Sequence, residues 1–282
     1  MGGSLKESQV STIIPTYNSE ETLGECLESI MRQTYPSCEV IVVDGYSKDR
    51  TLEIARKYGA KTLREKCGPA AARNIGIAHS KGKYVFFLDS DQTLSPPVIQ
   101  DCVGRCERSG VGMVRIPEIF VGKSFWSCCS AAWKNCYQRV ELREAGRNTL
   151  VGEPRFFVKD YIIRVGMFND SLLWGEDYDL YVRMRKTGVK EASCEFELYH
   201  YEPTSLREIL HKIYRYGGSL PIFTQRTGRK VFRTMFTHSL LTFEEVLREY
   251  GQFPKTVAGC TVLLCLKSYS IVLGLMTGLV FY

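Results

Sequence analysis

Two aspartates, Asp89 and Asp91, follow directly after the apolar segment YVFFL at residues 84–88. Residues two apart in an extended chain face the same side, so both carboxylates can point at one ligand. Paired carboxylates suit a hard divalent cation, and such a cation can neutralise the charge that builds up on a departing diphosphate. The alternative is a pair of turn-capping aspartates, which are common after strands.

The elements around these aspartates alternate between strands and helices. The pattern predicts strands at 10–14, 40–43, 84–88, 111–116, 155–158 and 191–199, and helices at 23–31, 47–58, 70–79, 98–106, 178–186 and from 205 onward. The first helix is expected to be capped by Asn18 with Glu21. This order predicts an α/β fold with a mainly parallel sheet covered on both faces.

Ligands of such sheets bind at the carboxyl ends of the strands. Residues 15–17, Asp44 and residues 89–91 all fall at that edge. The edge is therefore the predicted site.

Composition narrows the class of protein. The chain has 282 residues, of which 44% are hydrophobic and 24% charged, which excludes intrinsic disorder. Its eleven cysteines include no C-x-x-C pair, so we expect reduced thiols and not a zinc or disulfide framework. The N-terminal segment, residues 1–9, is short and mostly polar, so we expect no export signal there.

The positive charge is concentrated near the C-terminus. Residues 1–202 carry 27 basic and 27 acidic groups, whereas residues 203–256 carry nine basic and four acidic. No groove-reading motif supports a nucleic-acid partner. Because an apolar segment follows directly, a membrane surface is the better fit.

Five sequence blocks occur together in a characteristic order. They are IIPTYNSEETLGECLESI, VIVVDGYSKDRT, GPAAARNIGI, FLDSDQTL and GEDYDLYVRMRKTG. In order and spacing they resemble the family 2 glycosyltransferases over about residues 9–202. The resemblance implies the GT-A fold, a nucleotide-binding αβα sandwich, and an enzyme that moves a sugar from a nucleotide-sugar donor with a divalent metal, Mn²⁺ or Mg²⁺.

The resemblance also assigns roles to individual residues. Asp91 would ligate the metal directly, and Asp89 would contact the ribose or metal-bound water within the DXD motif. Asp44 would bind the base or ribose, although the sequence Asp44-Gly45-Tyr46-Ser47 keeps only the first of the family's usual two aspartates. The remaining residues expected to bind the nucleotide sugar are Pro15, Thr16, Tyr17, Glu20, Arg73, Asn74 and Ser90. Glu20 could equally serve the helix dipole.

An inverting transfer needs a base that takes the proton of the acceptor hydroxyl. Asp177 is the predicted base, and Glu176 would orient it or touch the acceptor. An N-cap role is the alternative for Asp177. His200 matches a third metal ligand or phosphate contact in relatives, but a lone histidine is often structural. Arg226 lies in QRTGR, which departs from the Gln-X-X-Arg-Trp motif of membrane-bound relatives, and it is our candidate for a diphosphate contact there.

The sequence predicts that the chain has three parts. We expect a GT-A catalytic domain at 1–202, a basic amphipathic helical region at 203–256, and a hydrophobic transmembrane or re-entrant segment at 257–282. The last segment has one charge, Lys267, whose cost opposes insertion. Residues 267–270 divide its apolar sequence, which suits a hairpin.

These observations lead to one hypothesis and its alternatives. The chain is expected to be a membrane-bound inverting hexosyltransferase, its catalytic domain on the cytosolic face. It would use a GDP- or UDP-sugar and a hydroxyl of a polyprenol- or dolichol-linked glycan. A polyprenol- or dolichol-phosphate sugar synthase is the alternative. A nucleotidyltransferase on a similar sandwich would need a Gly-rich loop directly after the first strand, and the sequence PTYN at that position is not such a loop.

A non-catalytic membrane scaffold is the remaining alternative. The presence of Asp89, Asp91 and Asp177 argues against it, because a scaffold would not need these carboxylates.

Overall fold

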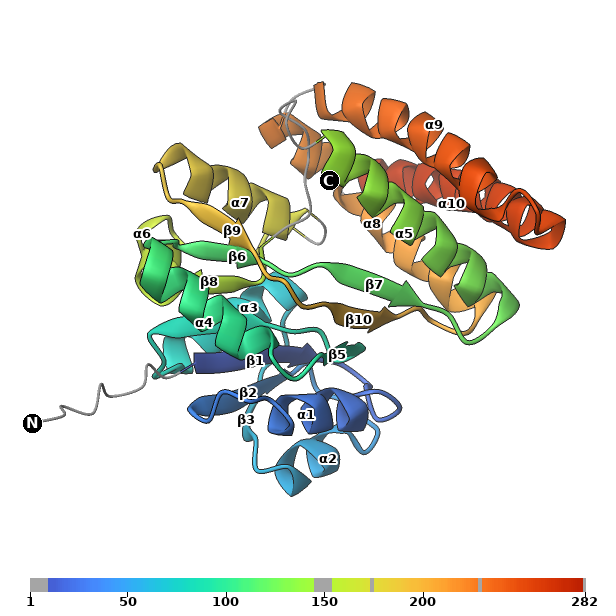
Figure 1. Ribbon diagram of the computed structural model, residues 1–282. Coiled ribbons are helices and arrows are strands. Elements are labelled where there is room, and N and C mark those ends of the chain that lie inside the picture. Colours follow the sequence, from blue (N-terminus) through green and yellow to red (C-terminus); the bar gives the residue numbers. More distant parts are fainter. Residues whose placement is uncertain (1–9, 145–153, 173–174, 228–229, 281–282) are drawn as a thin grey trace, which may run out of the picture. The chain divides into compact units, whose positions relative to one another are not determined.

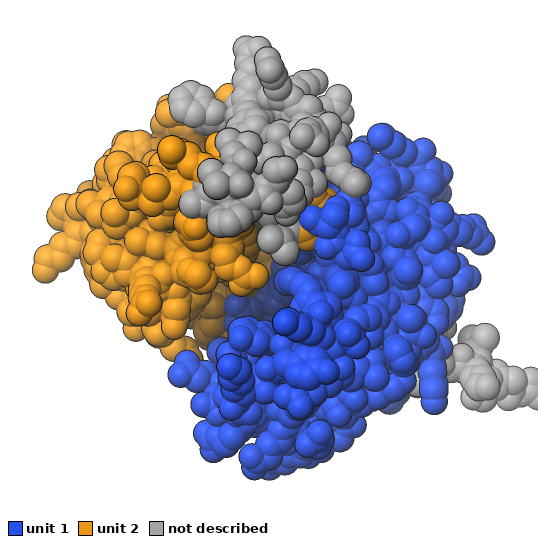
Figure 2. Space-filling model, turned by 180° about the vertical axis from the view of Figure 1, so that it is seen from behind, with its two compact units in different colours: residues 1–117, 153–171, 176–199 blue, residues 118–152, 172–175, 200–282 orange. Residues whose placement is uncertain are grey.

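A computed structural model describes residues 10–144, 154–172, 175–227 and 230–280 (Figure 1). The chain divides into two compact units (Figure 2). Unit 1 comprises residues 1–117, 153–171 and 176–199, and unit 2 comprises residues 118–152, 172–175 and 200–282. Residues 118–152 and 200–202 of the predicted catalytic domain, 1–202, belong to unit 2, and the functional boundaries of that domain stay a prediction.

A mostly parallel sheet forms the centre of unit 1. Within the described residues it has seven strands, in the order β3 (Lys61–Arg64), β2 (Cys38–Asp44), β1 (Val10–Thr16), β4 (Tyr84–Phe87), β8 (Phe156–Val158), β6 (Met113–Arg115) and β9 (Glu191–Ser193). Strand β8 runs antiparallel to both of its neighbours, and the other pairs are parallel.

Helices cover both faces of this sheet (Figure 1). On one face, α1 (Leu23–Met31), α2 (Thr51–Lys57) and α4 (Val98–Ser109) contribute to one core cluster. On the other, α3 (Pro69–His79), α6 (Lys159–Arg164) and α7 (Glu176–Lys186) contribute to a second. Strand β1 shows the alternation expected of a pleated sheet: Ile14 belongs to the first cluster and Ile13 to the second. The prediction of an αβα sandwich is confirmed.

The strand order reverses at β1. Strands β2 and β3 follow on one side of β1, and β4 lies on the other side. In open α/β sheets such a reversal leaves a crevice at the carboxyl ends of the strands. Thr16 ends β1, Asp44 ends β2, and Asp89 comes two residues after β4. The predicted edge of the sheet is therefore the one the topology favours.

Local signals misplaced several boundaries. Asn18 does not cap α1, which begins at Leu23; its φ is +49°, and its Oδ1 accepts a hydrogen bond from the Lys48 amide at 2.9 Å. Asn18 therefore joins two loops. Strand β3 is not predicted by the sequence, because KTLR is short and contains a single apolar residue. In the structure both ends of the strand are exposed. The predicted strand at 191–199 is two strands, β9 and β10 (Leu198–Tyr201).

Long helices make up most of unit 2. They are α5 (Phe125–Glu144), α8 (Leu206–Thr227), α9 (Lys230–Tyr250) and α10 (Pro254–Val280). Strand β7 (Glu118–Val121) lies beside β10 in a second sheet, and β5 (Gln92–Leu94) belongs to unit 1. The core of unit 2 contains Cys129, Cys136, Ile209, Val246 and Leu263. Helix α10 runs without a break through residues 267–270, so the structure shows one helix there and not two halves.

Helix α3 approaches β1 so closely that only glycine fits at residue 76. A Cβ at Gly76 would lie 2.3 Å from Cγ2 of the fully buried Ile13. We predict that Gly76→Ala lowers the free energy of unfolding by about 1–3 kcal/mol, the usual cost of overpacking, measured by denaturant titration. In the matched control, Gly24→Ala on α1, a Cβ would meet nothing within 4 Å, so the unfolding free energy should stay the same or rise. Equal effects of the two variants would contradict this account of the packing.

Candidate active site

The guanidinium of Arg73 lies at the centre of the predicted site. Arg73 sits on α3, and its side chain is almost completely buried. Its Nη2 donates to Oδ1 of Asp89 at 2.9 Å, and its Nη1 donates to Oε1 of Glu176 at 2.8 Å and lies 3.6 Å from Oδ1 of Asp177. One side chain therefore joins the exit of β4 to the first turn of α7.

Electrostatics explain why this arrangement holds. Burial alone would lower the pKa of Arg73, but the charges of Asp177, Asp89 and Glu176 raise it, so the guanidinium stays charged. Burial and the neighbouring charge of Asp177 raise the pKa of Glu176, which Arg73 opposes. A buried cation is stable only when it is paired in this way.

Arg155 belongs to the same group of side chains and was not predicted. It lies directly before β8, and its Nη1 is 3.3 Å from Oδ2 of Asp89. Strand β8 brings it there by pairing antiparallel with β4. The sequence signal, one arginine before the apolar FFV, could not reveal which strand β8 would join. We call Arg73, Arg155, Asp89, Glu176 and Asp177 the Arg73 cluster.

The DXD aspartates share one loop at the exit of β4. Burial, and then the charges of Asp91 and Asp89, raise the pKa of the Cys26 thiol well above its usual range. The charges of both carboxylates therefore act on that thiol. Their oxygens suit Mg²⁺ or Mn²⁺. Among the described residues, however, no group of three His, Cys, Asp or Glu side chains lies close enough to hold a metal ion, so these two carboxylates would need oxygens of the donor to complete a site.

Asp44 is fully buried at the end of β2. Its Oδ1 accepts from Oγ1 of Thr16 at 3.3 Å, and its Oδ2 accepts from the Ser47 amide at 3.0 Å. Nε of Arg64 lies 3.6 Å from the same Oδ2. These contacts tie the ends of β1, β2 and β3 together, and a contact of Asp44 with a base or ribose stays a prediction.

Two aromatic rings are exposed at this edge. Tyr17 follows β1 and is 62% exposed, and Tyr46 follows β2 and is 49% exposed. Tyr46 has a left-handed backbone, with a φ of +66°, and Arg64 stacks 4.5 Å from the centroid of its ring. Gly45 stands where the family usually has its second aspartate, and Tyr46, the next residue, places an aromatic ring at this edge.

The other residues predicted to bind the nucleotide make contacts within unit 1. Oε2 of Glu20 accepts from the amide and Nε of Arg50 at 3.1 and 3.2 Å. Ser90 donates to Oγ of Ser19 at 2.9 Å, and Pro15 is part of β1. Both polar groups of the Asn74 side chain bond the main chain of Phe168 at 2.9 Å, which is a structural role. Their contacts with a nucleotide stay predictions.

The two remaining predicted residues belong to unit 2. His200 is buried in β10; its Nδ1 lies 3.6 Å from Oε1 of Glu118, and its ring packs against Phe120. Arg226 lies near the end of α8. Neither a metal role for His200 nor a diphosphate role for Arg226 is tested by these positions.

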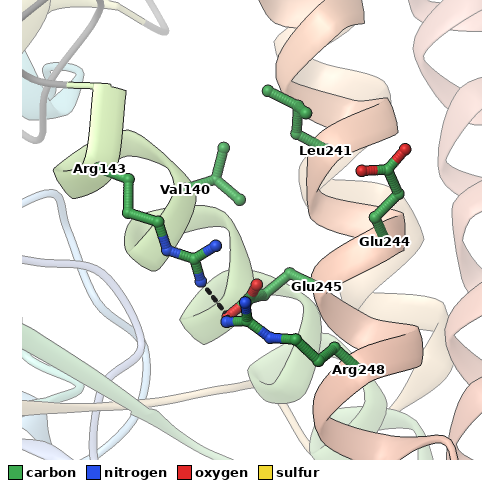
Figure 3. Close-up of a pocket in the computed structure, with 6 residues that line it drawn as sticks. All are labelled: Val140, Arg143, Leu241, Glu244, Glu245 and Arg248. Atoms are coloured by element: carbon green, nitrogen blue, oxygen red, sulfur yellow. Dashed lines mark hydrogen bonds and ion pairs between the residues drawn. The ribbon is translucent and has the colours of Figure 1, made fainter.

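A pocket in unit 2 contains none of the predicted site residues (Figure 3). Its volume is about 210 Å³, and it is lined by residues of α5 and α9, namely Val140, Arg143, Leu241, Glu244, Glu245 and Arg248. Arg143 and Arg248 both pair with Glu245. Three of the residues that line the pocket thus pair with one another, and none of the lining residues is a predicted site residue.

The chain is similar in sequence to known glycosyltransferases. Glycosyltransferase AglE of Haloferax volcanii is 29% identical over 74% of this chain and 71% of its own length. Three other relatives are matched over 15% to 58% of their length.

Solved structures share the fold. The mannosyltransferase PcManGT of Pyrobaculum calidifontis, in complex with GDP-Man and Mn²⁺, aligns with a TM-score of 0.64 and 18% identity, over 98% of this chain and 88% of its own. Staphylococcus aureus TarS 1-349 in complex with UDP-GlcNAc aligns with a TM-score of 0.56 and 18% identity, over 90% of each chain. The predicted GT-A fold is confirmed.

The profile of one sequence family, Glycosyl transferase family 2, matches residues 11–161. This match covers more than half of the chain, including β1, β4 with its two aspartates, and Arg73. The protein belongs to glycosyl transferase family 2.

Proposed function

We propose that the protein transfers a hexose from a nucleoside diphosphate sugar, with inversion, to a hydroxyl of a polyprenol- or dolichol-linked glycan at a membrane, with its donor site facing the cytosol. That it is a glycosyltransferase follows from its family. The observation that supports the proposed transfer chemistry is the Arg73 cluster, which joins the DXD motif and the acid pair of α7 through one buried cation.

The donor is proposed from the solved relatives and the exposed aromatic edge. PcManGT holds GDP-Man and TarS holds UDP-GlcNAc, so the fold accommodates either base. In this chain the rings of Tyr17 and Tyr46 offer surfaces on which a base could stack. Asp44, at the end of β2, lies two residues before Tyr46 in the chain.

Asp91 and Asp89 are the residues that would hold a divalent cation. A bound cation would neutralise the negative charge of the diphosphate as it leaves. We assign the direct ligand role to Asp91, as the family resemblance implies. Asp89 pairs with two guanidiniums, those of Arg73 and Arg155. Arg73, held by three carboxylates, acts as a positioning residue for both sides of the reaction.

Asp177 is the proposed base. It lies farther from Arg73 than Glu176 does, at 3.6 Å against 2.8 Å, and its side chain is more exposed, at 27% against 11%. It is therefore the freer of the two to meet an acceptor. Glu176 is held by the guanidinium of Arg73 and keeps Asp177 oriented.

The same acid pair supports the choice of acceptor. A lipid phosphate is already anionic and needs little help from a base, whereas a sugar hydroxyl must lose a proton as it attacks. A phosphate acceptor, as in a polyprenol- or dolichol-phosphate sugar synthase, is the alternative. A panel of nucleotide sugars with polyprenyl phosphate and polyprenyl-linked glycan acceptors separates the two.

The role of Asp91 gives a first test. Asp91→Ala should abolish both sugar transfer and the Mn²⁺-dependent part of nucleotide binding, because it removes the proposed direct ligand. Calorimetric titration of UDP and GDP with Mn²⁺ and with chelator measures the binding. Asp160→Ala, which removes an exposed aspartate on α6, is the control and should leave both unchanged. Substantial transfer by Asp91→Ala in the presence of chelator would refute the assignment.

The role of Asp177 gives a second. Asp177→Asn should keep donor affinity while kcat falls by a factor on the order of 10²–10⁴, the usual contribution of general-base catalysis. Steady-state kinetics and donor titration together measure this, with Asp170→Asn, an exposed aspartate of unit 1, as the control. A collapse of donor binding would show instead that Asp177 holds the donor.

A further inference from the structure

Helix α10 has an inverted distribution of side chains. On its buried side, small or polar residues accompany one leucine: Gly259, Cys260, Leu263, Ser270 and Gly274. Between residues 258 and 276 its exposed positions carry no charge and are largely apolar: Ala258, Thr261, Val262, Cys265, Ser268, Tyr269, Val272, Leu273 and Met276. A surface helix in water does the reverse, with its apolar stripe inside and its charges outside.

The buried side is fitted to α8 by close backbone contact. A Cβ at Gly274 would lie 1.9 Å from the carbonyl oxygen of Tyr214, and one at Gly217 would lie 2.2 Å from that of Ile271. Helices in a bilayer associate through small residues in this way, because burying large apolar side chains gains nothing in hydrocarbon.

The single charge of the apolar segment also faces inward. Nζ of Lys267 donates to Oγ of Ser130 at 2.9 Å, and Ser130 donates to Oε2 of Glu202 at 2.6 Å. Lys134 pairs with the other oxygen of Glu202. The charge of Lys267 therefore lies in an internal network with Glu202 as its counterion. Its free-energy cost for membrane insertion is reduced, because the ammonium does not face the lipid side of the helix.

We propose that the outer face of α10, from Val262 to Met276, contacts the hydrocarbon of a lipid bilayer. The inference rests on the membrane location in the proposed function and adds the face that meets the lipid. Residues 254–276 are long enough to cross a membrane and have a mean hydropathy of 1.7. The excess of basic over acidic groups in residues 203–256 complements anionic headgroups, which a purely apolar protein partner would not use.

The native Cys265, exposed on this face, allows a direct test. In a Cys128→Ser background, Cys265 is labelled with a polarity-sensitive fluorophore and the full chain is mixed with vesicles of phosphatidylcholine and phosphatidylglycerol. The control adds Cys265→Ser and Ile163→Cys, which moves the label to an exposed position on α6. Brominated acyl chains should quench the label at residue 265 several-fold more than the label at residue 163. Equal quenching at the two sites would overturn the proposal.

Charge variants test the same face without a label. Val272→Lys should weaken vesicle binding about tenfold or more, whereas Ile163→Lys should not, and both replace exposed aliphatic side chains. Lys267→Met should not strengthen binding, because that charge already faces inward; clear strengthening would count against the inference.

Two further outcomes are informative. If light scattering shows a dimer without lipid that Val272→Lys dissociates, a second copy covers the face and the inference is wrong. The vesicle assays contain no donor or acceptor. Inactivity toward polyprenyl acceptors with intact lipid contact would therefore refute the proposed function alone, and loss of lipid contact with intact transfer would refute the inference alone.

Discussion

One buried cation, the guanidinium of Arg73, organises unit 1. Arg73 has little access to water, and its charge is tolerable only because carboxylates from two other elements surround it. Those carboxylates in turn would repel one another without it. The close fit of α3 against β1 at Gly76, one turn further on, fixes where the guanidinium can be. Sheet geometry, helix packing and the position of the acids are thus parts of one electrostatic arrangement.

The sequence was a good guide to whatever depends on local pattern. The buried strands β1, β2 and β4 have continuous apolar sequences, and the aspartates that end or follow them fall at the edge that the topology favours. Arg73, Asp89, Glu176 and Asp177 were all named in advance, and the structure brings these four together. Their meeting was an implication of family resemblance, since nothing in spacing alone says that residues 73 and 176 share a hydrogen bond.

What could not be foreseen depends on contacts between distant segments. Arg155 reaches Asp89 only because β8 inserts between β4 and β6, and a three-residue strand carries no signal of its partners. Asn18 had the composition of a helix cap but serves a bridge between loops. Lys267 looked like an obstacle to insertion because a sequence does not show which side of a helix finds a counterion.

The antiparallel strand β8 also bears on how the chain acquires its fold. Unit 1 is discontinuous: after β6 the chain passes through residues 118–152 of unit 2 before it returns with β8. During synthesis, β4 must therefore wait some seventy residues for its neighbour, with an apolar sheet edge unpaired in the meantime. Loops of this length slow folding and favour aggregation. Partial chains that end before residue 158 should consequently need chaperones more than the finished protein does.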